Sequence, residues 1–380
     1  MKRTLFTLLA VGLTALGVNA QENKLLQGVK LSGYARVRYQ ATDQDGAKDN
    51  TFGLRLARVA LDGHAYDDFY YKLQMQVNGN IDNTAATNSS SIRLLDLFGE
   101  WQKFDFLRVK AGQFARPFTF ENPLDPISQG FMAYSQNVTN LAGFVDRTGE
   151  QASDGRDIGV QLQGDFLKTA KGRNLLHYEV GVFNGQGINT RDADNNKDLI
   201  GGLWVMPVEG LRIGAFGWTG SRGQMTYEEY AFDPTLKKNV KVEATEDVRK
   251  NRYAFSAEYA KDDWTIRSEY IHSQGKGNSV IGEDLRASDK ADGLYALCIV
   301  PVIKNKLHAK ARYDVYRAEA NWSVRKIMYE AGVDYVFGKN LQVSLEYARV
   351  NDHQRTFSAK VMNMVKNTYN VVDLELDFRF

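Results

Sequence analysis

The chain has 380 residues, of which 48 are lysine or arginine and 46 are aspartate or glutamate. This even balance gives no support for nucleic-acid binding, which usually shows as a basic excess. The single cysteine, Cys298, excludes an intramolecular disulfide and argues against a small disulfide-stapled fold.

The first twenty residues have the pattern of a secretory signal peptide. Basic residues at 2–3 precede an apolar run over 5–18, and 18–20 form a suitable cleavage site that would leave Gln21 as the first mature residue. The run is too short to cross a bilayer as a helix, which needs about 20 apolar residues. We therefore predict a signal peptide over 1–20 and a single domain over 21–380, which the strand pattern below makes a transmembrane β-barrel.

Alternation of apolar and polar residues recurs along almost all of the remaining chain, which indicates β-strands. Over 307–315, for example, apolar residues alternate with His308, Lys310, Arg312 and Asp314. Sixteen segments follow this pattern: 29–42, 51–63, 68–79, 92–103, 106–114, 155–166, 174–184, 198–206, 210–220, 250–260, 263–275, 290–300, 306–316, 326–337, 340–350 and 370–380.

The gaps between these segments alternate in length. Tight turns such as 104–105 and 338–340 are followed by longer connections, and the longest of these are 115–154, 185–197, 221–249, 276–289 and 351–369. Short turns on one rim and long loops on the other, with an even number of strands, are typical of bacterial outer-membrane barrels. We predict an all-β fold, a 16-stranded antiparallel transmembrane β-barrel with short periplasmic turns and long extracellular loops.

The last eleven residues, NVVDLELDFRF, have the clearest alternation. One face carries large apolar side chains from Val372 to Phe380, and the other carries Asp373, Glu375, Asp377 and Arg379. An unpaired charge is costly in a dry core, so this strand needs one wet face. A soluble edge strand is the alternative. The aromatic carboxyl terminus, Phe380, resembles the membrane-assembly terminus of outer-membrane barrels.

A barrel of this size predicts a channel. Eight strands fill with side chains, whereas sixteen leave an aqueous lumen, and residues 21–28 are too few to form a plug. The connection 115–154 contains Phe118, Phe120, Phe131 and Phe144, which would gain nothing in solvent. We expect this loop to fold into the lumen as a constriction and to pack its rings on the wall. A surface cap or a subunit contact is the alternative.

Four segments together resemble the phosphate-selective porin O and P family. They are VKAGQFARPFTFENPLDP (109–126), SGYARVRYQAT (32–42), GVFNGQG (181–187) and the terminal aromatic strand. The resemblance implies a sixteen-stranded, usually trimeric porin of the Gram-negative outer membrane, whose best-known members pass phosphate or polyphosphate along a basic lumen. The expected partners are then the lipid bilayer with its lipopolysaccharide, the outer-membrane assembly machinery, and small hydrophilic solutes or anions such as phosphate.

Both signs of charge face the lumen in this strand phasing. The predicted pore-lining bases are Arg36, Arg38, Lys72, Arg108, Lys110, Arg116, Lys310 and Arg312, and the acids are Glu330, Glu346, Asp373, Glu375 and Asp377. Bases gather on the first strands and acids on the last, which become neighbours when the barrel closes. We therefore expect ion pairs and a transverse field, not an anion-only path. Arg116, at the mouth of the long loop, is the base expected near a constriction.

Two places do not follow the simple pattern. In 51–63, Arg55 and Arg58 can both face inward only if the strand contains a β-bulge. The segments 198–206 and 210–220 are apolar on both faces, so their orientation is not predicted.

The sequence predicts no catalytic, metal or cofactor site. The five histidines lie far apart without ligand spacing, and pairs such as His177 with Glu179 lack a recognisable nucleophile. We predict a porin for passive diffusion of small hydrophilic solutes, either anions or mixed ions. The alternatives are a dedicated phosphate channel, a non-conducting structural or adhesin barrel, and a catalytic barrel.

Overall fold

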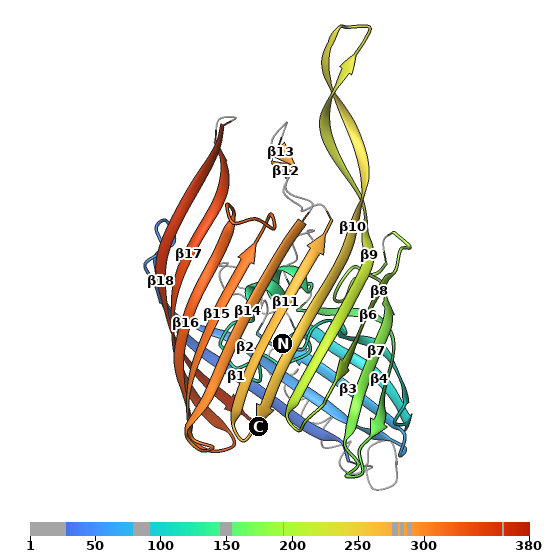
Figure 1. Ribbon diagram of the computed structural model, residues 1–380, viewed down its shortest axis with the longest axis vertical. Helices are drawn as coiled ribbons and strands as arrows, with labels where there is room; N and C mark the ends of the chain where they lie inside the picture. Colours follow the sequence, from blue (N-terminus) through green and yellow to red (C-terminus); the bar gives the residue numbers. More distant parts are fainter. Residues whose placement is uncertain are drawn as a thin grey trace, which may run out of the picture.

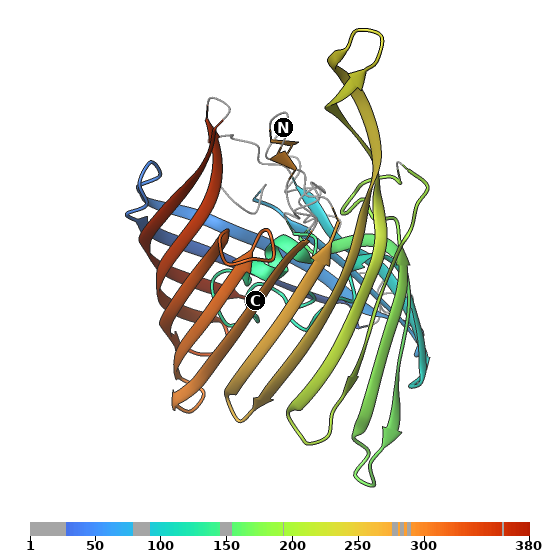
Figure 2. The same cartoon turned by 45° about the horizontal axis from the view of Figure 1, so that its top comes forward.

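The structure of the protein is a computed structural model that describes residues 28–78, 92–144, 154–192, 194–275, 280–281, 285–286, 290–358 and 361–380. The predicted signal peptide lies outside these residues. Sixteen antiparallel strands close into one barrel (Figures 1 and 2), so the predicted fold class is confirmed. None of the described helices has the length and apolar character that a bilayer crossing needs.

The sixteen predicted segments correspond one to one to the barrel strands. These are β1 (Lys30–Thr42), β2 (Asp49–Ala65), β3 (Phe69–Gln76), β4 (Arg93–Phe104), β5 (Leu107–Ala115), β6 (Arg156–Lys168), β7 (Asn174–Phe183), β8 (Asp198–Val205), β9 (Leu211–Asp233), β10 (Lys238–Lys261), β11 (Trp264–Gln274), β14 (Lys290–Ile303), β15 (Leu307–Arg317), β16 (Arg325–Val336), β17 (Leu341–Ser358) and β18 (Val361–Arg379). The short strands β12 (Val280–Ile281) and β13 (Leu285–Arg286) form a separate hairpin, and the helix α2 (Gln136–Leu141) follows β5.

Two connections that we predicted as loops are strands. β9 and β10 stay paired out to Asp233 and Lys238, and β17 and β18 out to Ser358 and Val361. Figure 1 shows the β9–β10 ribbon rising far above the rim of the barrel. The prediction ended these strands where the alternation of apolar and charged residues stops. A two-stranded ribbon beyond the rim has no lipid-facing side and needs no such alternation.

The barrel closes between β1 and β18. Gly33 and Phe380 exchange two backbone hydrogen bonds of 3.0 Å, and the Phe380 ring lies across Gly33, where a Cβ atom would come within 2.4 Å of the ring. Along this seam the apolar residues Leu374 and Phe378 are exposed on the outside, whereas Asp377 is buried inside. The predicted alternation of the last strand is therefore confirmed.

The β-bulge predicted in 51–63 is present. The register between β1 and β2 shifts by one residue at Arg55. Arg55 and Arg58 then both face inward, where Arg55 lies 3.3 Å from Glu375 and Arg58 pairs with Asp154.

The structure also orients β8 and β9. Ile200 of β8 and Phe216 and Trp218 of β9 are buried on the inner face, while Leu199 and Ile213 are exposed on the outer face. An apolar inner face in a polar lumen requires a covering layer, because apolar surface is stabilised when it is removed from water.

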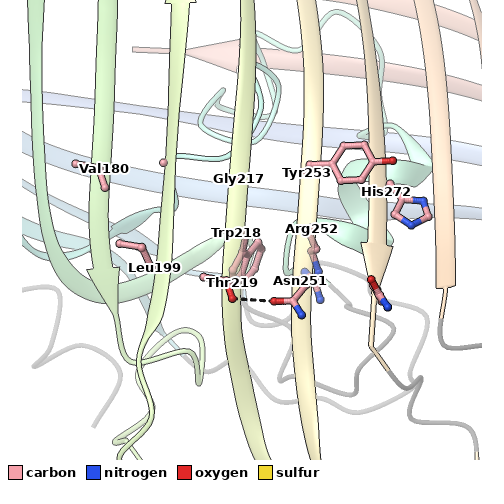
Figure 3. A pocket seen from close by; sticks show the side chains of 11 residues that line it. Val180, Leu199, Gly217, Trp218, Thr219, Asn251, Arg252, Tyr253 and His272 are labelled. Carbon is pink, nitrogen blue, oxygen red and sulfur yellow. Dashed lines mark hydrogen bonds between the residues drawn. The ribbon is translucent and has the colours of Figure 1, made fainter.

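The pocket in Figure 3 lies on the outer face of the same strands. Gly201 and Gly217 are register partners, and their missing side chains leave a groove of about 500 Å³ edged by Val180, Leu199 and Tyr253. The groove belongs to the lipid-facing surface, not to the lumen, because exposed residues alternate here with the buried inward residues of the same strands.

Candidate functional site

Residues 116–144, here called the inserted loop, lie inside the barrel. Both views show this turquoise segment and α2 enclosed by the strands (Figures 1 and 2). The loop contacts strands that are far apart round the barrel. Phe118 packs on Trp218 of β9, with ring centroids 5.4 Å apart, and Asp125 accepts a 3.3 Å hydrogen bond from Tyr34 of β1. One segment can touch both strands in this way because it runs through the lumen.

Aromatic side chains hold the first and last parts of the loop against β7–β11. Phe118, Phe120 and Phe144 join a buried cluster with Phe216 and Trp218. Burying a side chain of this size stabilises a fold by about 1.5–3 kcal/mol. The loop is therefore the layer that covers the apolar inner faces of β8 and β9.

The middle of the loop has a second apolar contact. Phe131 is buried against Tyr295 and Leu297 of β14. The cationic groups of Lys310 and Arg312 lie 5.0 and 4.5 Å from the centre of its ring, within the range of cation–π attraction.

Charged wall residues bind the backbone of the loop. Among the described residues, six basic side chains donate to loop carbonyls: Arg36 to Pro126, Arg379 to Ile127, Arg267 to Gln129, Lys310 to Gly130, Arg312 to Ala133 and Arg252 to Leu141. Three carboxylates accept loop N–H groups: Glu269 from Phe120 and Glu121, Glu346 from Met132, and Asp314 from Gln136. Charge-assisted bonds of this kind are stronger than neutral ones, so much of the charged lining serves to hold the loop.

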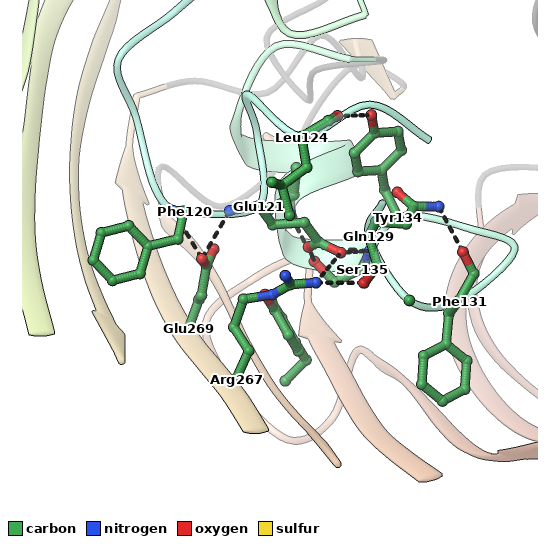
Figure 4. A network of polar contacts seen from close by, with 12 residues as sticks. Phe120, Glu121, Leu124, Gln129, Phe131, Tyr134, Ser135, Arg267 and Glu269 are labelled. Carbon is green, nitrogen blue, oxygen red and sulfur yellow. Dashed lines mark hydrogen bonds and ion pairs between the residues drawn. The ribbon is translucent and has the colours of Figure 1, made fainter. Parts of the chain in front are cut away.

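A polar network within the loop supports these anchors (Figure 4). Ser135 donates to Glu121 and also caps the first turn of α2. Arg267 from the wall lies 3.9 Å from Glu121. Tyr134 donates to the Leu124 carbonyl at 2.5 Å. Burial, and secondly the nearby Asp154 carboxylate, raise the pKa of the Tyr134 phenol well above its usual value, so it remains a donor.

Three of the predicted pore-lining bases are buried in ion pairs. Arg36 lies 2.6 Å from both Glu375 and Asp377, Lys310 lies 2.7 Å from Asp334 and 2.5 Å from Glu346, and Arg312 lies 2.5 Å from Glu330. These pairs also account for four of the five predicted acids. The fifth, Asp373, lies 4.0 Å from Arg38 across the seam. Bases and acids do meet where the first and last strands join.

Arg116 does not face the lumen. Its side chain is fully buried at the root of the loop, 3.0 Å from Asp157 and 4.9 Å from the centre of the Trp218 ring. Asp157, which the sequence analysis did not consider, also accepts the Gly185 N–H at 3.0 Å. A guanidinium closed off in this way cannot meet a passing solute, so its place in the fold is that of a structural anchor.

The other predicted bases reach water. They are Arg38, Lys72, Arg108 and Lys110, and the structure adds Arg212, which the sequence could not place because its strand was not oriented. Each base is more exposed than its acidic partner: Arg38 23% against Asp373 17%, Lys72 23% against Asp96 5%, Arg108 23% and Lys110 18% against Glu100 6%, and Arg212 28% against Glu258 11%. Long basic side chains extend past their partners toward water, so within these pairs the charge nearer to water is positive.

Three of these bases, Lys72, Arg108 and Lys110, lie on strands β3 to β7. We call the inner face of these strands the β3–β7 wall. Lys110 lies 3.7 Å and Arg108 4.0 Å from Glu100, and Arg108 also lies 2.8 Å from Asp165. Within the described ranges, no group of three or more His, Cys, Asp or Glu side chains is placed to hold a metal ion.

The sequence of residues 29–203 matches the family described as phosphate-selective porin O and P. The matched part, which is somewhat less than half of the chain, is similar to this family. It contains β1 to β7, most of β8 and the whole inserted loop, so the resemblance seen in the sequence is confirmed there. No match to a curated protein was found.

Solved structures of other outer-membrane proteins share the fold. An anion-selective porin from Comamonas acidovorans is similar over 93% of this chain and 99% of its own, with a TM-score of 0.63 and 12% identity. The outer membrane channel DcaP of Acinetobacter baumannii is similar over 93% and 97%, with a TM-score of 0.60 and 11% identity. The trimer form of OmpT, an outer membrane protein of Vibrio cholerae, is similar over 93% and 100%, with a TM-score of 0.56 and 14% identity.

Proposed function

We propose that the protein is an outer-membrane porin through which small hydrophilic solutes diffuse passively, with a preference for anions. The main support is the unequal exposure of the two members of each ion pair on the inner wall. The base is more exposed to water than its acid in the pairs of Arg38, Lys72, Arg108, Lys110 and Arg212. Fixed charges along an aqueous path set which ions are enriched there. The path therefore concentrates anions although the paired charges nearly balance.

The inserted loop gives this path its shape. It is held against β1, β18, β17 and β15 by wall side chains and against β9–β11 by aromatic rings. The open side of the lumen is then the β3–β7 wall. In this proposal solutes pass between that wall and the loop, which acts as the constriction.

Recordings of the purified protein in planar lipid bilayers test the proposal. We expect discrete conductance steps and, in a potassium chloride gradient, a reversal potential of the sign that chloride preference produces. A reversal potential at zero, or of the opposite sign, would rule out the anion preference. A protein that inserts but gives no steps would favour the non-conducting structural or adhesin barrel.

A dedicated phosphate channel is the narrower form of this function. Block of chloride current by micromolar phosphate would favour it, and equal currents in chloride and phosphate would count against it. Because Arg116 is buried, we now expect any such block to depend on Lys110 and Arg108. A channel, not an enzyme, fits the family match and the fold.

The assembly and the processing of the chain are also proposals. The trimer form of a similar structure supports a homotrimer, which would migrate above the monomer mass on an unboiled gel. Insertion would use the outer-membrane assembly machinery and the Phe380 terminus. Cleavage between Ala20 and Gln21 would be seen by amino-terminal sequencing of protein from the outer membrane.

A further inference from the structure

Polar side chains meet aromatic rings on the inner face of β4–β8. Lys110 has Glu100 as its register partner on one side and Gln161 on the other. One step along the strands, Arg108 neighbours Gln163, and Gln163 neighbours Glu179. Two acids, two bases and two amides are thereby gathered on one patch of the β3–β7 wall, which we call the amide patch.

Two buried atoms of the amide patch have no hydrogen-bond partner among the described residues. The Gln161 amide is 2% exposed, and its Nε2 donates to Gln163 at 2.6 Å and to Glu179 at 3.3 Å. Its Oε1 accepts no hydrogen bond from the described residues, and the same holds for the buried Arg108 Nε as a donor. Leaving a buried polar atom unpaired costs about 1–3 kcal/mol. Both atoms are buried, so a solute that enters the patch reaches this acceptor and this donor by displacing the side chains that cover them.

Aromatic rings border this patch on two sides. The Lys110 ammonium lies 5.2 Å from the centre of the Phe98 ring and 5.3 Å from that of Phe114. His177 is stacked on Trp204 with ring centroids 4.1 Å apart. Phe98 and Trp204 are the partly exposed margin of the buried aromatic cluster. An apolar surface therefore lies beside the cations of the patch.

We propose that the amide patch binds hydroxylated organic anions, such as acidic sugars, as they pass through the lumen. A hydroxyl group can donate to Gln161 Oε1 and accept from Arg108 Nε, a carboxylate can pair with Lys110, and the carbon face of a sugar ring can lie on Phe98 or Trp204. An inorganic anion has no apolar face for the rings, and a neutral sugar leaves the cations without a partner. Only a solute with both features uses the whole patch.

This inference rests on the proposed function, because the patch meets solutes only if the lumen conducts. The test is block of the chloride current in planar bilayers by four added solutes: glucuronate, glucose, acetate and inorganic phosphate. We expect glucuronate to block at about tenfold lower concentration than the other three, which corresponds to one additional well-formed contact. Equal block by acetate or phosphate would reduce the patch to a general anion site, and equal block by glucose to a neutral sugar site. Either result would overturn the inference.

Two variants locate the effect. Gln161→Ala should raise the half-blocking concentration of glucuronate about fivefold and leave the conductance steps and the reversal potential unchanged. Phe98→Leu, which keeps an apolar side chain but removes the ring, should weaken glucuronate block and not acetate block. Gln40→Ala is the matched control, because Gln40 of β1 bonds to Asp373 across the seam and lies outside the patch.

The outcomes separate the two proposals. Absence of conductance steps would overturn the porin function and this inference with it. Normal steps and chloride preference, with glucuronate block that is unchanged in Gln161→Ala, would overturn the inference alone.

Discussion

The two sides of the lumen use the same charged residue types for different purposes. On the loop side, Arg36, Lys310 and Arg312 are buried, paired with acids and bonded to loop carbonyls. On the β3–β7 wall, Lys72 and Lys110 are paired more loosely, at 3.4 and 3.7 Å, and remain in contact with water. Burial and second partners, not the sign of a charge, therefore separate a side chain that builds the channel from one that faces the solute.

The largest effect should come from removing the aromatic anchor of the loop side. Phe118→Ala should lower the free energy of unfolding by about 3–5 kcal/mol, because the side chain is fully buried and the barrel wall cannot collapse into the space. Denaturant unfolding in detergent or lipid would measure this. The matched control is Phe166→Ala, since Phe166 is 41% exposed near a short turn. Equal losses in both variants would mean that the loop is not anchored through Phe118.

The next effect concerns the root of the loop. Arg116→Ala should destabilise the protein by roughly 3 kcal/mol, because Asp157 is left as a buried, unpaired charge. The double variant with Asp157→Asn should recover part of that loss, as measured by a double-mutant cycle. The chloride preference should persist in the folded protein of both variants. If Arg116→Ala protein were stable but no longer preferred chloride, Arg116 would have to contact the solute. The two sides of the lumen would then not differ in the roles of their bases.

The lumen has two distinct sides only if the barrel is closed, and the seam between β1 and β18 is where closure can be broken. Gly33→Val should cost about 1–3 kcal/mol, because its side chain would meet the Phe380 ring and the Arg58 carbonyl. On a gel of unboiled samples, we expect a smaller fraction of folded protein for Gly33→Val than for the unchanged protein. Partial recovery in the double variant with Phe380→Ala would show that the ring is the obstacle. Unchanged assembly of Gly33→Val would mean that the ring readily leaves its place.

The smallest effect should come from a single water-facing base. Lys72→Gln should reduce the chloride-to-potassium permeability ratio about twofold, the size expected for one screened surface charge. Folding should be spared, because Asp96 keeps Arg156 at 2.6 Å as its partner. Reversal potentials measure the ratio, and Lys168→Gln serves as the control, because Lys168 is an exposed residue at the end of β6. A larger change in the control would place the selective charges outside the lumen.

The sequence predicted those parts of the molecule that are governed by one local rule. Residues 370–380 must have one wet and one apolar face, and the alternation alone determines which residues face inward. The bulge at Arg55 could be found for the same reason, since two arginines out of phase need an extra residue between them. Conversely, strands β8 and β9 have two apolar faces because the inserted loop covers the inner one, and that contact joins residues distant in sequence.

The roles of individual bases were less predictable. Alternation places Arg36 and Lys72 on the same inner face, but only tertiary contacts decide that one is buried under the loop and the other reaches water. Arg116 was expected near the solute because it begins the long loop, whereas burial by Asp157 and Trp218 depends on residues far along the chain. Arg212 could not be found until its strand was oriented by Phe216 and Trp218.

The way in which the wall grips the inserted loop has an evolutionary consequence. Its bases and acids hold carbonyl oxygens and N–H groups that nearly every amino acid supplies, so most substitutions in the loop leave those attachments intact. Related channels can then exchange loop side chains, and with them the solutes they admit, while the segment keeps its course across the pore.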